Sequence, residues 1–150
     1  RCLVSLDDGS LTLHNILIPV HHAPDPRTAI EFARRVAGIA VGGKVTITLL
    51  HVGAAMPDIR FADGPAWKAV RMQRDGDPVD QIVDTADALK AELIVMPTAG
   101  RAGVFEALRG STTERVLRHA SCPLLAVPAA EARGDRPLRA RAGTKLMASA

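Results

Sequence analysis

Short apolar runs of strand length alternate along this chain with segments whose apolar residues recur every three or four positions. The runs at residues 15–20, 45–52 and 123–127 are apolar or β-branched nearly throughout, as is typical of strands covered on both faces. The segment between the first two runs carries a helical stripe made of Ala29, Phe32, Ala33, Val36, Ala37 and Ala40. Strands separated by helices predict a parallel α/β sheet with right-handed crossovers and helices on both faces.

The sequence predicts five strands and three helices. Residues 67–74 alternate basic and apolar side chains, which indicates an edge strand with one exposed face. Asp77 and Pro78 mark a helix start, because aspartate caps a first turn and proline fits its first position. Residues 53–65 are rich in turn-forming residues and predict a loop with at most one helical turn. The predicted strands are residues 15–20, 45–52, 67–74, 91–97 and 123–127, and the predicted helices are residues 29–40, 78–89 and 112–119.

Composition favours one compact domain and argues against several classes of protein. The chain has 150 residues, of which 47% are hydrophobic, and no apolar run approaches the 18 or so residues that span a bilayer. Two cysteines do not make a disulfide framework, and the first residues lack the apolar core of a signal peptide, so a cytoplasmic protein is expected. Residues 131–150 hold five basic and two acidic residues, which accounts for the whole net charge of +3. Nucleic acid is therefore not expected as a partner, and residues 129–150 are expected to form a disordered basic tail.

The candidate site lies where several predicted strands end. In parallel sheets of this kind a ligand binds outside the carboxyl ends of the strands, where the strand order switches. Residues 19–22, 51–53 and 97–103 all fall at those ends, so three separate segments converge on one crevice. His21, His22 and His51 gather there, but no acidic residue or cysteine stands at a spacing that completes a tetrahedral metal site. We expect no metal, and we expect His51 to be a partly buried side chain hydrogen-bonded beneath the loop.

A glycine-containing loop follows the fourth predicted strand and leads to a helix start. Gly100 and Gly103 allow the backbone to turn and to approach a ligand closely. Ser111 and Glu114 have the spacing of a capping box at a helix amino terminus, whose amide groups attract anions. The pattern is that of a phosphate-binding loop. A tight turn followed by an ordinary helix cap explains the same residues without a ligand, so both interpretations stay open.

Several segments, taken together and in order, resemble the universal stress protein family. They are Asn15-Ile-Leu-Ile-Pro-Val, Leu49-Leu-His-Val, residues 87–97, and Gly110-Ser-Thr-Thr-Glu-Arg-Val-Leu-Arg-His-Ala-Ser-Cys-Pro-Leu-Leu-Ala-Val-Pro. The resemblance covers residues 14–128 and leaves residues 1–13 as an extension, a linker or the end of a preceding domain. It implies the Rossmann-like, adenine-nucleotide α-hydrolase-like fold, with a five-stranded parallel sheet in the order 3-2-1-4-5. It also implies a homodimer, or pairing with a tandem sister domain, through the last strand at Leu124 to Val127.

The family's nucleotide-binding pattern, Gly-x2-Gly-x9-Gly-Ser/Thr, matches only in part. Gly100 and Gly110-Ser111 fit the pattern, but Pro97 stands at the first glycine. His21 stands where the family has an aspartate that faces the nucleoside, and Val52 matches the position that contacts adenine. The nucleotide-contacting set that the resemblance implies is Pro19, Val20, His21, Val52, Met96, Pro97, Thr98, Gly100, Arg101, Gly103, Gly110, Ser111 and Thr112.

These observations predict a non-enzymatic module of the stress response that binds ATP or another adenine nucleotide, with Mg²⁺ only alongside ATP. Pro97 cannot donate a backbone N–H, and His21 is larger than aspartate and of opposite charge when protonated. A ligand-free interaction module of the same fold therefore stays open as an alternative. No nucleophile with an evident base is found in the sequence, so catalytic residues are not expected. Slow nucleotide hydrolysis is the third alternative.

Overall fold

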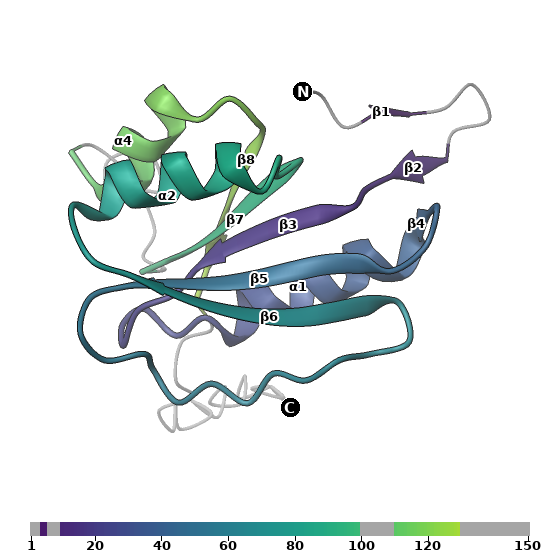
Figure 1. Ribbon diagram of the computed structural model, residues 1–150, viewed down its shortest axis with the longest axis horizontal. Coiled ribbons are helices and arrows are strands. Elements are labelled where there is room, and N and C mark those ends of the chain that lie inside the picture. The colour runs from purple at the N-terminus through teal and green to yellow at the C-terminus, as the bar shows by residue number, and fades with distance from the viewer. Residues whose placement is uncertain (1–3, 6–9, 100–109, 130–150) are drawn as a thin grey trace, which may run out of the picture.

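The computed structural model describes residues 4–5, 10–99 and 110–129 and forms one α/β layer structure (Figure 1). Its main sheet consists of five parallel strands in the order β6-β5-β3-β7-β8. These strands are β3 (Asn15–Pro19), β5 (Val45–Val52), β6 (Trp67–Arg74), β7 (Leu93–Thr98) and β8 (Leu124–Pro128). If these five strands are numbered 1 to 5 in chain order, their order in the sheet is 3-2-1-4-5. The expected fold class is confirmed.

A second, smaller sheet is a detail that the sequence did not predict. It joins three two-residue strands in the order β1-β2-β4, namely β1 (Val4–Ser5), β2 (Leu11–Thr12) and β4 (Ala40–Val41). The division of the chain into residues 1–13, 14–128 and 129–150 stays a prediction, and of the basic tail all but residue 129 lies outside the described residues.

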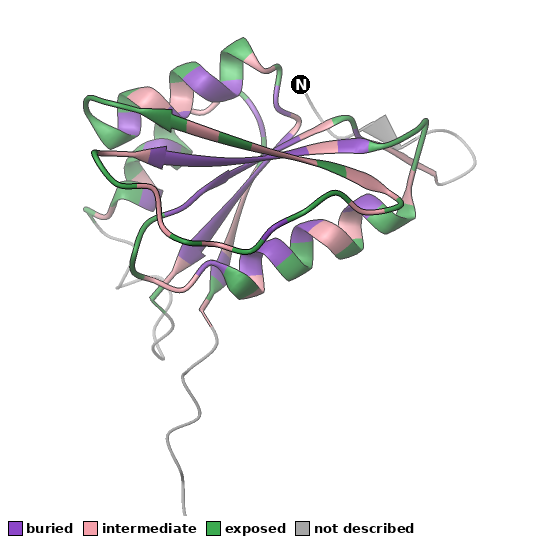
Figure 2. Cartoon of the chain, turned by 60° about the horizontal axis from the view of Figure 1, so that its bottom comes forward, coloured by how far each residue is buried: buried purple, intermediate pink, exposed green. Residues whose placement is uncertain are grey.

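Helices cover both faces of the main sheet. Helix α1 (Arg27–Ile39) packs on one face, and α2 (Pro78–Ala88) and α4 (Thr112–His119) pack together on the other. Buried residues are concentrated in the inner strands, whereas β6 carries exposed side chains along the free edge (Figure 2). This edge position of β6, the loop before it and the capping of α2 by Asp77 were all predicted correctly.

The first helix differs from its predicted stripe. It ends at Ile39, so Ala40 belongs to β4 instead of the helix. Ile30 is buried with Ala29, Ala33 and Ala37, while Phe32 is 37% exposed. At about 100° per residue, Phe32 lies well to one side of the direction in which those four side chains point. A spacing pattern that admits several apolar residues does not fix which side of the stripe faces the sheet.

Candidate functional site

The backbone pairing of the two central strands stops before their carboxyl ends. Backbone pairing of β3 with β7 is confined to Ile16 opposite Leu93 and Leu17 opposite Ile94. Beyond this point β3 continues to pair with β5, and β7 continues to pair with β8. The unpaired ends of β3 and β7 therefore lie at the switch in strand order, where a ligand of an α/β sheet is expected, and we call this region the crevice.

Two prolines explain why the pairing stops there. In a parallel ladder, alternate residues direct their backbone groups to opposite neighbours. Val20 N–H donates to Leu50 of β5 and Ile94 N–H donates to Pro123 beside β8, so the nitrogens of Pro19 and Pro97 face the gap between β3 and β7. Neither proline has an N–H to donate across that gap. The chain thus lacks ladder donors on both strands at the level where their pairing ends.

A cluster of three histidines lies at the carboxyl ends of β3 and β5. The ring centroids of His21, His22 and His51 are 5.4 to 5.9 Å apart. His51 is only 2% exposed, and its Nδ1 lies 3.0 Å from the carbonyl oxygen of Val20. The hydrogen bond expected for His51 is confirmed, and the ring is fully buried instead of partly so. Among the described residues, no group of three or more histidine, cysteine, aspartate or glutamate side chains has the geometry of a metal site.

The loop after β5 is held against the sheet by side chains of the edge strand. Gln73 donates from Nε2 to the carbonyl oxygens of Gly53 and Ala54, at 2.8 and 3.0 Å. Arg71 donates to the carbonyl oxygen of Ile59 at 2.5 Å. These contacts fix the segment that follows Val52, whose side chain is half-buried at the end of β5. Sequence reasoning treated the basic residues of β6 only as an exposed face and missed this role.

The amino end of α4 carries the predicted site residues Gly110, Ser111 and Thr112. Ser111 caps the helix, and its Oγ accepts a hydrogen bond from the N–H of Glu114 at 3.2 Å. The carboxylate of Glu114 accepts a hydrogen bond from the N–H of Gly110, which has a φ of +71°. The predicted Ser111–Glu114 cap is therefore present, with the glutamate reaching Gly110. One of the amides that a phosphate would use is already bonded in the absence of a ligand.

The predicted site residues differ in what they can offer a ligand. Pro19, Val20, Met96 and Pro97 are buried, and Met96 packs into the core beneath α2 and α4. The other described members of the set are half-buried or exposed, namely His21, Val52, Thr98, Gly110, Ser111 and Thr112. Thr98 lies within β7 and not in the loop after it. Gly100, Arg101 and Gly103 lie outside the described residues.

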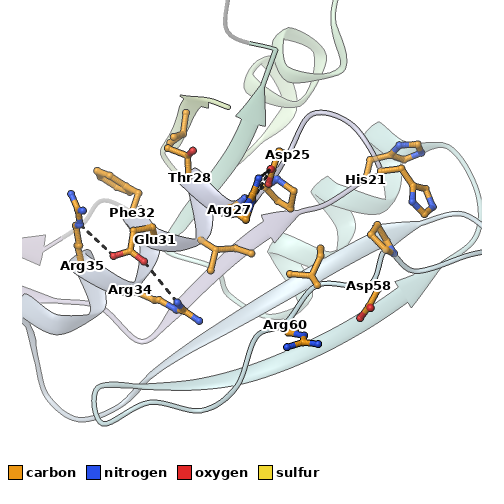
Figure 3. A pocket seen from close by; sticks show the side chains of 16 residues that line it. His21, Asp25, Arg27, Thr28, Glu31, Phe32, Arg34, Arg35, Asp58 and Arg60 are labelled. Carbon is orange, nitrogen blue, oxygen red and sulfur yellow. Dashed lines mark hydrogen bonds and ion pairs between the residues drawn. The ribbon is translucent and has the colours of Figure 1, made fainter. Parts of the chain in front are cut away.

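A groove adjoins this site on the α1 face and shares His21 with it (Figure 3). It has a volume of about 1120 Å³ and lies between α1 and residues 57–60. Its charged side chains are Asp25, Arg27, Glu31, Arg34, Arg35, Asp58 and Arg60. Arg27 bonds to Asp25, and this hydrogen bond lowers the pKa of the Asp25 carboxyl. Sequence reasoning did not identify the groove, because its lining comes from the outer face of a helix and from a loop.

Sequence comparison connects the chain to known proteins. Residues 60–128 match the model of the Universal stress protein family. The chain is 47% identical over 53 residues to Universal stress protein MJ0531 of Methanocaldococcus jannaschii, covering 35% of this chain and 31% of that protein. It is 28% identical over 133 residues to Universal stress protein E of Escherichia coli, covering 73% of this chain and 42% of that protein. The chain thus spans less than half the length of these relatives.

Solved structures show the same fold. Universal stress protein UspA from Lactobacillus plantarum has a TM-score of 0.58 and 21% identity, covering 77% of this chain and 98% of that one. An Archaeoglobus fulgidus universal stress protein in complex with dAMP has a TM-score of 0.52 and 19% identity, covering 75% and 96% of the two chains. At these identities the structural likeness speaks for the fold alone. In the part of the chain that the structure describes, no helix has the length and apolar character needed to cross a membrane. The family match over residues 60–128, the two relatives and the fold together support a UspA-like domain of the universal stress protein family in this chain.

Proposed function

We propose that this domain binds an adenine nucleotide in the crevice between β3 and β7 and acts as a non-enzymatic module of the stress response. The observation that carries the proposal is the end of backbone pairing between β3 and β7 after Leu17 and Ile94, at the switch in strand order. The base and sugar would lie on the β3 side of this crevice, against the ends of β3 and β5 that lead to His21 and Val52. The phosphates would lie toward the amino end of α4, where Gly110, Ser111 and Thr112 begin the helix.

Relatives of the fold support this class of ligand. The Archaeoglobus fulgidus structure contains dAMP, and an Arabidopsis thaliana family member with a TM-score of 0.53 and 14% identity contains AMP. The proposed contact set is Pro19, Val20, His21, Val52, Met96, Pro97, Thr98, Gly100, Arg101, Gly103, Gly110, Ser111 and Thr112. The buried members would contribute through backbone groups. Mg²⁺ would enter only with a nucleotide that carries several phosphates.

A ligand-free interaction module is the second candidate, and the cap of α4 favours it. The Glu114 carboxylate bonds to the N–H of Gly110, while Ser111 bonds to the N–H of Glu114. A phosphate approaching this end of the helix meets a carboxylate of like charge. Binding would require Glu114 to leave Gly110, which costs part of the affinity.

Assembly through the last strand forms part of the proposal. Strand β8 lies at the edge of the main sheet, and Leu124, Leu125 and Ala126 are half-buried there. An edge strand with apolar side chains can pair with a second sheet. We therefore expect a homodimer, or pairing with a tandem sister domain in a longer protein. Replacing Leu125 by arginine should shift the mass measured by light scattering toward that of a monomer.

Thermal melting with nucleotides tests the binding proposal. A ligand at one hundred times its Kd adds about 2.7 kcal/mol to the free energy of unfolding. We expect the melting temperature to rise with the concentration of AMP, ADP or ATP. Inorganic phosphate should cause no rise. No rise at millimolar adenine nucleotide would refute nucleotide binding and favour the ligand-free module. Phosphate release measured alongside the ATP melts would identify slow hydrolysis.

Two substitutions refine the same test. Pro97→Gly and His21→Asp restore the residues of the family pattern and should strengthen the shift with ATP. His22→Asp is the matched control, because His22 is the exposed neighbour of His21 and bonds instead to the carbonyl oxygen of Ala55. If His22→Asp strengthens binding as much as His21→Asp does, a nonspecific effect of the added charge explains the result, and the proposed contact at position 21 is refuted.

A further inference from the structure

We propose that His51 is a positioning residue that fixes the ends of β3 and β5, against which the nucleoside binds. The inference rests on the proposed function. It starts from the location of the ring, which is 2% exposed at the carboxyl end of β5 and contacts both the end of β3 and the turn after β5. His51 was expected from the sequence to be only a buried, hydrogen-bonded side chain.

On one side, His51 holds the end of β3. Its Nδ1 lies 3.0 Å from the carbonyl oxygen of Val20. A carbonyl oxygen only accepts hydrogen bonds, so Nδ1 carries the proton that is donated. The peptide group between Val20 and His21 is planar, and fixing its oxygen also fixes its N–H group. The bond thereby sets the direction in which the chain, and with it the exposed His21 side chain, leaves the strand.

On the other side, His51 supports the turn that follows Val52. Gly53 has a φ of +138°, a conformation that residues with a side chain rarely adopt. A Cβ atom at Gly53 would lie 3.1 Å from Nε2 of His51, so the ring leaves little room for a side chain in this turn. The N–H of Gly53 donates to the carbonyl oxygen of Arg74 at 2.9 Å, which holds the same turn from the β6 side. One ring therefore joins the segments that carry His21 and Val52.

The bond to Val20 begins where the backbone ladder ends. The pairing of β3 with β5 reaches Pro19 opposite Leu50, and the N–H of Val20 adds a final bond to the carbonyl oxygen of Leu50 at 2.8 Å. The ladder already fixes the register of the two strands, so the His51 bond is not needed for that. What it adds is an exact position for the first peptide group outside the sheet.

The chemistry of the position also speaks against a purely space-filling role. Val45, Ile47 and Leu49 point to the same side of β5 as His51, and all three are apolar and buried. An apolar side chain at position 51 would continue this row without having to satisfy a polar group. A buried polar group is costly unless it is bonded, and a bonded one specifies a single geometry. His51, the polar member of this row, stands at the end of β5 that borders the candidate site.

Four variants test the inference. His51→Asn keeps an amide donor close to the position of Nδ1, His51→Gln places its amide farther along the side chain, and His51→Leu has no donor. Thr48→Val is the matched control, because Thr48 is also buried and polar on β5, at 2% exposure. Affinities for adenosine, AMP and ATP are measured by calorimetry on variants whose circular dichroism shows a folded domain.

We expect His51→Leu and His51→Gln to weaken all three ligands by a similar factor, about tenfold, because the contact concerns the nucleoside that they share. His51→Asn and Thr48→Val should stay within about threefold of the unsubstituted protein. A loss confined to ATP, or equal losses for His51→Asn and His51→Gln, would overturn the inference. The Asn–Gln comparison holds even if His51→Leu fails to fold.

A ligand-free measurement separates this inference from the proposed function. Amide hydrogen exchange at Val20 and Gly53, whose N–H groups donate to Leu50 and Arg74, should accelerate about tenfold in His51→Gln and remain unchanged in Thr48→Val. If no adenine nucleotide binds the unsubstituted protein, the proposed function fails, and with it the nucleoside-positioning role of His51. If nucleotides bind but neither exchange nor affinity responds to His51→Gln, the inference alone fails.

Discussion

Replacing Glu92 by glutamine tests how the two central strands are joined at the end opposite the crevice. The Glu92 carboxylate accepts hydrogen bonds from the backbone N–H groups of His14 and Asn15, at 2.5 and 3.1 Å. Its second oxygen lies 3.3 Å from Nδ1 of His14. The N–H of Glu92 in turn donates to the carbonyl oxygen of Asn15 at 2.9 Å. This side chain thus ties the start of β3 to the start of β7.

The expected loss follows from the charge of the acceptor. A hydrogen bond to a charged group contributes about 1.5–3 kcal/mol, and one between neutral groups about 0.5–1.5 kcal/mol. The amide of Glu92→Gln can still accept both backbone bonds but without the charge. With the side chain 21% exposed, we expect the free energy of unfolding to fall by about 1–3 kcal/mol at neutral pH. For a chain of this size each kcal/mol lowers the melting temperature by about 2–4 °C.

The pH dependence supplies an independent check. Burial raises the pKa of the Glu92 carboxyl, but the hydrogen bonds from His14 and Asn15 outweigh burial and bring that pKa below its ordinary value of 4.5. A pKa that is lower in the folded state gives stability above the unfolded-state pKa, and this stability is lost as the pH falls through the folded-state pKa. The difference between the two proteins should therefore be constant above about pH 5.5 and shrink below pH 4.5.

Urea unfolding followed by circular dichroism between pH 7 and pH 3 measures both effects. Glu31→Gln is the matched control, since Glu31 is 53% exposed and its ion pairs with Arg34 and Arg35 are 3.8 and 3.7 Å long. We expect it to cost less than about 1 kcal/mol. Equal losses in the two variants, or a Glu92→Gln loss that persists unchanged at pH 3, would refute the reasoning.

Two further pairs of substitutions test local structure. Asp77→Ala removes the cap of α2 and should cost about 1 kcal/mol in urea unfolding, whereas Asp84→Ala, an exposed change on the same helix, should stay within about 0.5 kcal/mol; equal costs would contradict the capping role. Gly64→Ala would place a Cβ atom 2.3 Å from the Trp67 ring and should destabilise by about 1–3 kcal/mol with a change in tryptophan fluorescence. Gly38→Ala is the control, because a Cβ atom there meets nothing within 4 Å, and it should be neutral or stabilise by up to about 1 kcal/mol. If Gly38→Ala lowers the free energy of unfolding as Gly64→Ala does, crowding against Trp67 is not the cause of the loss.

The elements predicted best are those with strong local signals. Residues 45–52 and 67–74 were placed with the bounds that β5 and β6 have, because turn-rich residues flank both strands. The helix at residues 112–119 was also placed correctly, since Ser111 provides an unambiguous cap. The two-residue strands of the small sheet could not be predicted. Their pairing connects residues 11–12 with residues 40–41, and two residues carry no periodicity.

The site was predicted less completely than the fold, because tertiary contacts decide which predicted residues face a ligand. Sequence position brought His21 and Val52 to the same edge of the sheet, but it could not show that Met96 points into the core. Nor could it show that the Glu114 carboxylate reaches Gly110. Such contacts depend on the angle between a helix and the sheet, which periodicity does not encode.

Pro97 illustrates how one substitution can act in two directions. Compared with the glycine of the family pattern, Pro97 removes a backbone N–H that could donate a hydrogen bond to a ligand. In the structure the nitrogen of Pro97 faces the gap between β3 and β7, so the same proline also denies β7 a bond that would draw β3 closer. Pro19 acts likewise from the other strand. The two prolines therefore leave the ends of β3 and β7 unpaired and also withhold a donor from a ligand there. Any bound phosphate must find its partners elsewhere, and in the proposed pose these are the backbone amides at the amino end of α4.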